Sequence, residues 1–218
     1  MSGFTVFDIE TGPLPDDEIR KIAPPFDPES VRTGNMGIEK IAEKIDGVRR
    51  NYFNGIKRKA ALHAEYGRVL AIGWESDGNT VVQIADEKTM LKNFWDASDE
   101  THHAQGKWVG FNVFHFDLPF LIRRSIINGV TVPRGLQPKN NRYYPDFWVD
   151  LMQCWQAGDY RETISLDRFA KALGHGGKNG SGSAFAETLK NDESAAIAYL
   201  ENDLLLTRQV ATACFNVF

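Results

Sequence analysis

The fold is decided by the stretch FTVFDIETG, which runs from Phe4 to Gly12. Its apolar residues predict a buried β-strand, in which successive side chains point to opposite faces of a sheet. Val6, Asp8 and Glu10 would therefore share one face. Both acids would also lie near the carboxyl end of the strand, where open α/β sheets place their ligand sites.

Two carboxylates on one strand face need a positive neighbour. At a separation of about 6 to 7 Å and an effective dielectric near 20, they repel by roughly 2 to 3 kcal/mol. The sequence has no Lys or Arg within several residues of the strand. Divalent cations such as Mg²⁺ and Mn²⁺, which prefer oxygen ligands, would resolve the repulsion. The alternative is that both acids are solvated at the rim of the sheet.

Two further stretches carry acids at positions where they could join the first pair. In NVFHFDLPF, Asp117 follows an apolar strand and precedes Pro119, so it has the sequence of a helix N-cap as well as of a site residue. In YLEND, Tyr199 and Asp203 are four residues apart and share one face of a predicted helix. Alone, such a pair is typical of a solvated surface.

The order of apolar segments predicts one α/β domain over residues 1–218, with a mixed β-sheet covered by helices. Trp148, Leu151 and Trp155 recur at helical spacing, and Ser165 is the expected cap of a helix that stops at Gly174. We expect strands at 4–10, 68–76, 80–86 and 108–112, and helices at 87–98, 118–129, 165–174 and 183–218.

A long polar interval, at about 12–66, separates the first two strands and predicts a helical insertion. Its apolar residues Ile38, Ile41, Ile45 and Val48 repeat at helical spacing. A basic run from residue 49 to residue 59 contains five Lys or Arg side chains. This run is either a solvated helix face or a contact for phosphates. The Gly-rich stretch 174–185 lacks the spacing of a Walker loop, so we expect a mobile loop there.

Composition limits the classes of protein that the chain can represent. The sequence has 25 Lys and Arg against 29 Asp and Glu, so any site for a polyanion must be local. Its two cysteines are too few for a disulfide framework. No stretch has the length of a membrane span or the pattern of a secretion signal, and we expect a soluble, cytoplasmic protein without membrane contact.

Together, the three acidic stretches resemble the 3′→5′ exonucleases of the RNase H-like superfamily in their tyrosine (DEDDy) version. DIET, at 8–11, is similar to their first motif, NVFHFD to the second and YLEND to the third. The second motif, with Asn112, Phe116, Asp117 and Pro119, is especially similar to that of the exonuclease domain of family B DNA polymerases. The long insertion departs from the minimal pattern of this superfamily.

The resemblance implies an RNase H-like sheet and a metal-dependent active site. Asp8, Glu10, Asp117 and Asp203 would bind two Mg²⁺ or Mn²⁺ ions, roughly 3.5 to 4 Å apart, for hydrolysis of the terminal phosphodiester bond. Tyr199 would orient the attacking water, because a phenol of ordinary pKa near 10 is a poor base at neutral pH.

The resemblance also implies contacts with the substrate. Thr11 and Leu14 would contact the terminal nucleotide, and Asn112 would form a hydrogen bond near the site. The expected partner is a nucleic acid with a free, single-stranded 3′ end, with DNA favoured over RNA. The alternatives are an exoribonuclease, a catalytically silent nucleic-acid-binding module of the same fold, and a phosphoesterase for small nucleotides.

Overall fold

The computed structural model describes residues 3–139, 143–178, 180 and 182–217. Backbone contacts divide the chain into two compact units. The core unit comprises Met1–Thr11 and Val69–Phe218, and the insertion unit comprises Gly12–Arg68. The expectation that both belong to one domain stays a prediction.

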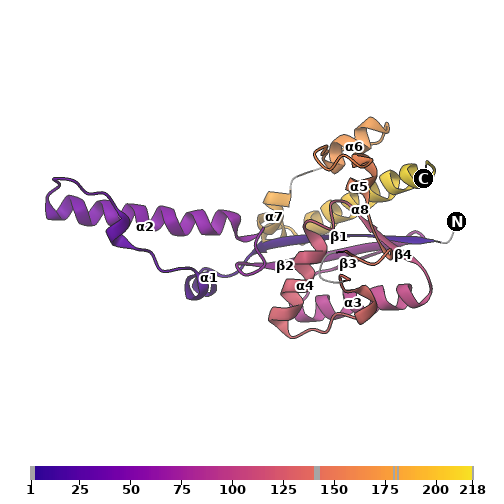
Figure 1. The fold of residues 1–218 in the computed structure, drawn as a ribbon, viewed down its shortest axis with the longest axis horizontal. Helices are drawn as coiled ribbons and strands as arrows, with labels where there is room; N and C mark the ends of the chain where they lie inside the picture. Colours follow the sequence, from indigo (N-terminus) through magenta and orange to yellow (C-terminus); the bar gives the residue numbers. More distant parts are fainter. Residues whose placement is uncertain (1–2, 140–142, 179, 181, 218) are drawn as a thin grey trace. The chain divides into compact units, whose positions relative to one another are not determined.

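A mixed five-stranded sheet forms the centre of the core unit (Figure 1), in the order β3-β2-β1-β4-β5. β1 pairs in parallel with β4, and β4 pairs in parallel with β5, whereas β2 and β3 are antiparallel. The predicted α/β mixed sheet is therefore confirmed. The strands are β1 (Phe4–Pro13), β2 (Gly67–Ser76), β3 (Asn79–Gln83), β4 (Lys107–Gly110) and β5 (Trp148–Asp150).

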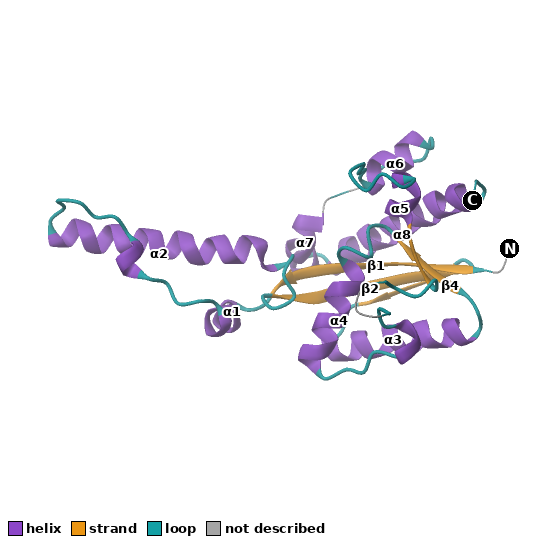
Figure 2. Ribbon diagram, in the orientation of Figure 1, coloured by secondary structure: helices purple, strands orange, loops and turns teal. Residues whose placement is uncertain are grey.

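Helices cover both faces of this sheet (Figure 2), with α8 on one face and α3 and α4 on the other. None of the helices in the described part of the chain has the length and apolar character needed to cross a membrane. Those of the core unit are α3 (Glu87–His103), α4 (Asp117–Asn128), α5 (Leu151–Gln156), α6 (Leu166–Ala172), α7 (Phe185–Asn191) and α8 (Glu193–Phe215), with 3₁₀ turns η2 (Arg134–Leu136) and η3 (Gly182–Ala184).

The alternation of side chains along β1 fixes which face carries the acids. Val6 lies in the buried cluster that includes Leu204 of α8. Phe7 points to the opposite face, where its ring lies 5.5 Å from the ring of Phe94 in α3. Because Asp8 is two residues after Val6, its side chain lies on the α8 face.

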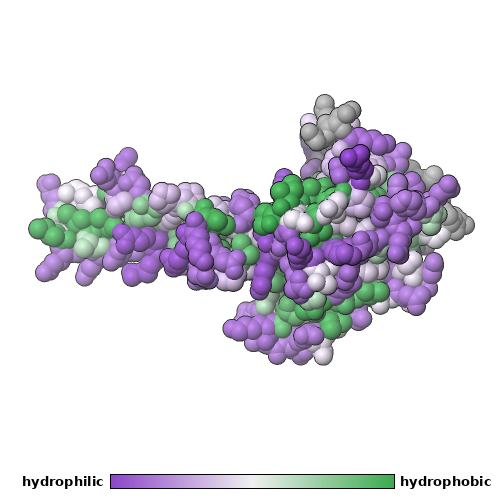
Figure 3. Space-filling model, turned by 90° about the horizontal axis from the view of Figure 1, so that it is seen from below, coloured by the Kyte–Doolittle hydropathy of each residue, from purple (hydrophilic) through white to green (hydrophobic). Residues whose placement is uncertain are grey.

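The insertion unit contains α1 (Asp16–Ile22), η1 (Pro28–Ser30) and α2 (Ile38–Ala60). Its own small core is formed by Ile19, Phe53 and Ala60. The expected helix is present, but the first part of its apolar stripe is not buried: Ile38 is 87% exposed and Val48 37%. Apolar side chains are visible on the surface of this unit in Figure 3.

Two expectations about the C-terminal half are wrong. Trp148 does not begin a helix, because it lies in β5, and α5 starts only at Leu151. The predicted continuous helix over 183–218 is interrupted at Asp192, which has an extended backbone with φ −153°. The side chain of Asp192 accepts a hydrogen bond from the Ala195 N–H, so Asp192 is the N-cap of a separate helix, α8.

Candidate active site

β1 and α8 bring three of the predicted acids together. Glu10 and Asp203 are 7% and 0% exposed, and Asp8 is half-buried. One carboxylate oxygen from each of Asp8, Glu10 and Asp203 can be chosen so that all three lie within 4.8 Å of one another. Tyr199, one helical turn before Asp203, is also buried, at 7% exposure. The face shared by Tyr199 and Asp203 is therefore not a solvated surface.

Asp117 reaches the same region from the start of α4. The N-cap of α4 is Phe116, whose side chain forms no capping bond, and Asp117 is the first helical residue. The expectation that Asp117 is the N-cap residue of this helix is therefore wrong. Asp117 is 4% exposed, and its pKa is raised well above the ordinary value by burial and then by the charge of Asp8.

The turn that leads to Asp117 is held by Asp150, a buried residue at the end of β5. One oxygen of its carboxylate accepts bonds from the N–H groups of Asn112 (2.7 Å) and Met152 (2.9 Å), and the other accepts from Phe114 (3.0 Å). Asn112 has φ +61°, a left-handed conformation that costs free energy in a non-glycine residue. Asp150 thus stabilises the turn that positions Asp117.

Crowding of carboxylates changes the acidity of the cluster. Burial, followed by the charge of Asp203, raises the pKa of Asp8 to about 7. Burial, followed by the charges of Asp8 and Asp203, raises the pKa of Glu10 to about 9. At neutral pH the metal-free cluster therefore holds at least one proton, because the acids cannot all ionise at this separation.

Lys178 is a member of the site that the sequence did not reveal. Its Nζ lies 2.5 Å from Oδ2 of Asp203 and 3.4 Å from the hydroxyl oxygen of Tyr199. It belongs to the Gly-rich stretch 174–185, for which we expected only a mobile loop. Two described glycines of this stretch also approach the site: a Cβ at Gly180 would lie 2.9 Å from the Tyr199 ring, and one at Gly182 would lie 3.5 Å from a Glu10 oxygen.

The donor set fits a divalent cation. Oδ1 of Asp203 is buried and has no hydrogen-bond partner among the residues that the structure describes. A buried oxygen without a partner is costly, and coordination of a cation would satisfy it. All of the neighbouring ligands are carboxylate oxygens, which suit Mg²⁺ and Mn²⁺.

A cavity of about 520 Å³ opens beside these acids, and its lining includes Asp8, Asn112, Asp117, Lys178 and Tyr199. The predicted substrate residue Asn112 therefore lies next to the acidic cluster.

The other two predicted substrate residues lie on or after β1. Thr11 is half-buried on the strand, one residue after Glu10. Leu14 lies in the insertion unit, where it packs against the cluster of Ile19, Phe53 and Ala60. The contacts of Thr11 and Leu14 with a nucleotide stay predictions.

The solved family B DNA polymerase of the hyperthermophilic archaeon Pyrobaculum calidifontis is similar to this chain, with a TM-score of 0.60 at 18% sequence identity. The similarity covers 98% of this chain and 24% of the polymerase chain, so this chain spans about a quarter of the polymerase's length. At this identity the likeness shows the fold, and the expected RNase H-like fold is confirmed. No curated protein matches the sequence at a significant level.

A family model described as a predicted 3′-5′ exonuclease related to the exonuclease domain of PolB matches residues 61–211. This range is more than half of the chain and contains Asp117, Tyr199 and Asp203, whereas Asp8 and Glu10 precede it. The resemblance to the exonuclease domain of family B DNA polymerases is confirmed, while the tyrosine subtype stays a prediction. The chain belongs to this family of predicted 3′-5′ exonucleases related to the exonuclease domain of PolB.

Proposed function

We propose that the protein is a metal-dependent 3′-5′ exonuclease that removes nucleotides from the 3′ end of single-stranded DNA. One observation carries this proposal: carboxylates from β1 and α8 converge within 4.8 Å, and one buried oxygen of Asp203 has no partner among the described residues. The family match supports the same class of reaction. We place the enzyme in the cytoplasm and treat both units as parts of one domain.

Asp8, Glu10, Asp117 and Asp203 would hold two Mg²⁺ or Mn²⁺ ions. When bound, these ions would supply the Lewis acidity that activates water at neutral pH and the positive charge that stabilises the leaving 3′ oxygen. The carboxylates bind the ions in their ionised form. Because the pKa values of Asp8 and Glu10 are raised to about 7 and 9, loading the site at neutral pH releases protons.

Tyr199 and Lys178 would act by orientation and charge. Burial, followed by the charge of Asp203, raises the pKa of Tyr199 above its ordinary value, so its hydroxyl stays protonated and donates a hydrogen bond to the attacking water or to the substrate. Lys178 contacts Asp203 at 2.5 Å and holds that carboxylate in place, with its charge partly compensated.

The terminal nucleotide would lie in the cavity beside the acids. Asn112 lines this cavity and would donate a hydrogen bond to the substrate, while Thr11 and Leu14 would contact the terminal nucleotide. A single strand suits such a site, because the terminal nucleotide must leave its stack before the scissile phosphate can reach the acids.

The test is hydrolysis of a 5′-labelled single-stranded DNA oligonucleotide in Mg²⁺ or Mn²⁺. We expect a ladder of progressively shortened 5′-labelled products, which EDTA abolishes. Asp8→Asn should remove the activity, whereas Asp96→Asn, the same change on the exposed surface of α3, should not.

Folding of the Asp8→Asn variant is checked by its thermal midpoint without metal. This midpoint should not fall, because the folded protein disfavours a charge at this position. Exclusively internal cleavage, or full activity in Asp8→Asn, would refute the assignment. A matched RNA oligonucleotide tests the preference for DNA, since RNA cleaved at an equal or higher rate contradicts it.

A further inference from the structure

The insertion unit differs in charge from the rest of the chain. Gly12–Arg68 contains 11 Lys and Arg against 9 Asp and Glu, whereas the remaining residues contain 14 against 20. The acids of the insertion unit are concentrated before residue 47, and no acid occurs between residues 47 and 64. The second half of α2 and the segment after it are therefore locally basic within an acidic protein.

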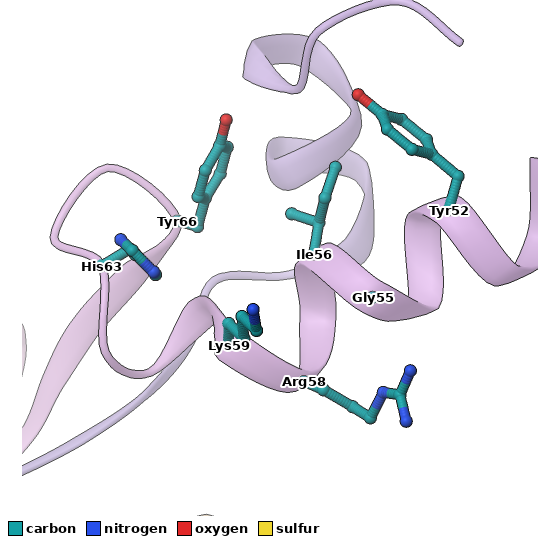
Figure 4. A pocket seen from close by; sticks show the side chains of 7 residues that line it. All are labelled: Tyr52, Gly55, Ile56, Arg58, Lys59, His63 and Tyr66. Carbon is teal, nitrogen blue, oxygen red and sulfur yellow. The ribbon is translucent and has the colours of Figure 1, made fainter. Parts of the chain in front are cut away.

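This basic segment surrounds a pocket that lies wholly within the insertion unit. The pocket has a volume of about 680 Å³. In Figure 4, Tyr52, Ile56 and Tyr66 project to the same side of the backbone, with Lys59 below them, whereas Arg58 is directed away from the tyrosines. The lining thus joins two aromatic rings and an aliphatic side chain to basic groups.

Contacts within the insertion unit leave these groups available to a ligand. Lys57 forms an ion pair with Asp16 at 2.7 Å. In contrast, Arg58 and Lys59 are exposed, and neither has an ion-pair partner in the part of the chain that the structure describes. The two positive charges are therefore not needed to hold the described contacts together.

The two tyrosines are held in place by contacts that leave their rings accessible. The hydroxyl of Tyr52 donates a hydrogen bond to the carbonyl oxygen of Pro24 at 3.1 Å, while the residue remains 37% exposed. Tyr66 packs against the cluster of Ile19, Phe53 and Ala60 and is only partly buried. Rings fixed in this way lose little conformational entropy when a planar group stacks on them.

We propose that this pocket is a second binding site for single-stranded nucleic acid. The bases of the nucleic acid stack on Tyr52 and Tyr66, and Arg58 and Lys59 bind its phosphates. Proteins that bind single strands without sequence preference combine these two kinds of contact. An acidic peptide would need apolar or aromatic residues among its acids to use the rings, whereas every nucleotide carries both a base and a phosphate, so nucleic acid fits the lining better.

The purpose of this second site, to hold the substrate, rests on the proposed exonuclease function. The insertion unit begins at Gly12, two residues after Glu10, so the chain keeps it tethered to the strand that carries the catalytic acids. A strand bound to the pocket would therefore have a raised local concentration at those acids. Long substrates gain from this tether, whereas substrates of two or three nucleotides do not.

The test measures binding separately from cleavage. The full-length protein is titrated against fluorescein-labelled dT20 in EDTA, which prevents hydrolysis. Arg58→Ala/Lys59→Ala should bind about tenfold more weakly than wild type. Its plot of log K against log salt should be shallower by about 1.4, since each phosphate contact on a single strand contributes about 0.7. Lys40→Ala/Lys88→Ala removes the same charge at exposed positions outside the pocket and is the control.

A second measurement needs no substitution. An abasic 20-mer keeps the phosphates but offers nothing to the tyrosine rings, so wild type should bind it at least fivefold more weakly than dT20. Equal binding of dT20 by Arg58→Ala/Lys59→Ala and by the control would overturn the inference. So would an affinity for poly-glutamate that matches the affinity for dT20, because the pocket would then suit an acidic protein.

The two proposals fail separately. If wild type degrades dT20 in Mg²⁺ but Arg58→Ala/Lys59→Ala binds dT20 as tightly as the control variant does, the exonuclease proposal stands and the second binding site is refuted. Conversely, a pocket variant that loses binding in EDTA supports the second site even when wild type degrades nothing.

Discussion

Asp150→Ala tests whether one buried carboxylate positions the turn that leads to Asp117. The substitution removes the acceptor for three backbone N–H groups, those of Asn112, Phe114 and Met152, at 2.7, 3.0 and 2.9 Å. Asp150 is 2% exposed, and Asn112 and Phe114 are half-buried, so water replaces the lost acceptor poorly. The left-handed backbone of Asn112 also loses the bond that holds it in place.

The expected loss of stability follows from these bonds. A hydrogen bond to a charged group contributes about 1.5 to 3 kcal/mol, and loss of a helix cap such as the bond to Met152 costs about 1 kcal/mol. Burial raises the pKa of Asp150, which shows that the folded protein disfavours its negative charge. Removal of this charge therefore offsets part of the lost stability. We expect a net decrease of about 3 kcal/mol in the free energy of unfolding, which lowers the thermal midpoint by about 6 to 12 °C in a chain of this size.

The assay is urea and thermal unfolding of Asp150→Ala beside Asp192→Ala. The control removes one exposed capping bond, from the Ala195 N–H at 3.0 Å, and should cost only about 1 kcal/mol. Exonuclease activity, measured well below both midpoints, should fall in Asp150→Ala and persist in the control. Equal destabilisation of the two variants, or full activity in Asp150→Ala, would refute the role given to Asp150.

Three further predictions concern the acidic cluster. Without metal, the thermal midpoint should fall as the pH rises from about 5 to 9. The folded protein holds protons on Asp8 and Glu10 up to pKa values of about 7 and 9, whereas the unfolded chain releases these protons near pH 4. Asp8→Asn should flatten this pH dependence. Calorimetric titration with Mn²⁺ at pH 7, in buffers of different ionisation enthalpy, should detect release of about one proton or more, and absence of release would contradict the raised pKa values. Lys178→Met should lower kcat about tenfold or more and change dT20 affinity in EDTA less than threefold; a loss confined to KM would argue against a role in holding Asp203.

Simple periodicities predicted which acids share a face within each element, whereas the meeting of β1 and α8 in one cluster was expected only from the resemblance to the exonucleases. The two-residue period of a strand puts Val6 and Asp8 on one face, and the structure places Val6 in the cluster with Leu204 of α8. The near-four-residue period of a helix puts Tyr199 and Asp203 on one face of α8, and both are buried. Such rules need no knowledge of how distant segments pack.

Lys178 and Asp150 could not be assigned in this way because their roles depend on contacts between distant segments. Lys178 lies in a Gly-rich stretch without periodicity and meets Asp203, 25 residues later in the chain. Asp150 accepts bonds from Asn112 and Phe114, more than 35 residues earlier. One signal was present for Lys178: it is the only lysine or arginine in the stretch 174–185 that precedes the third motif.

The insertion unit shows that periodicity predicts a helix more securely than it predicts burial. Ile38, Ile41, Ile45 and Val48 specify α2 correctly, yet Ile38 is 87% exposed. The buried core of this unit uses Phe53 and Ala60, which pack with Ile19 from the short helix α1. α1 has 7 residues and can cover only part of α2, which has 23 residues, so the apolar stripe of α2 extends beyond the part that α1 covers. Sequence spacing records which side chains share a face, whereas the length of the neighbouring element decides how many of them leave water.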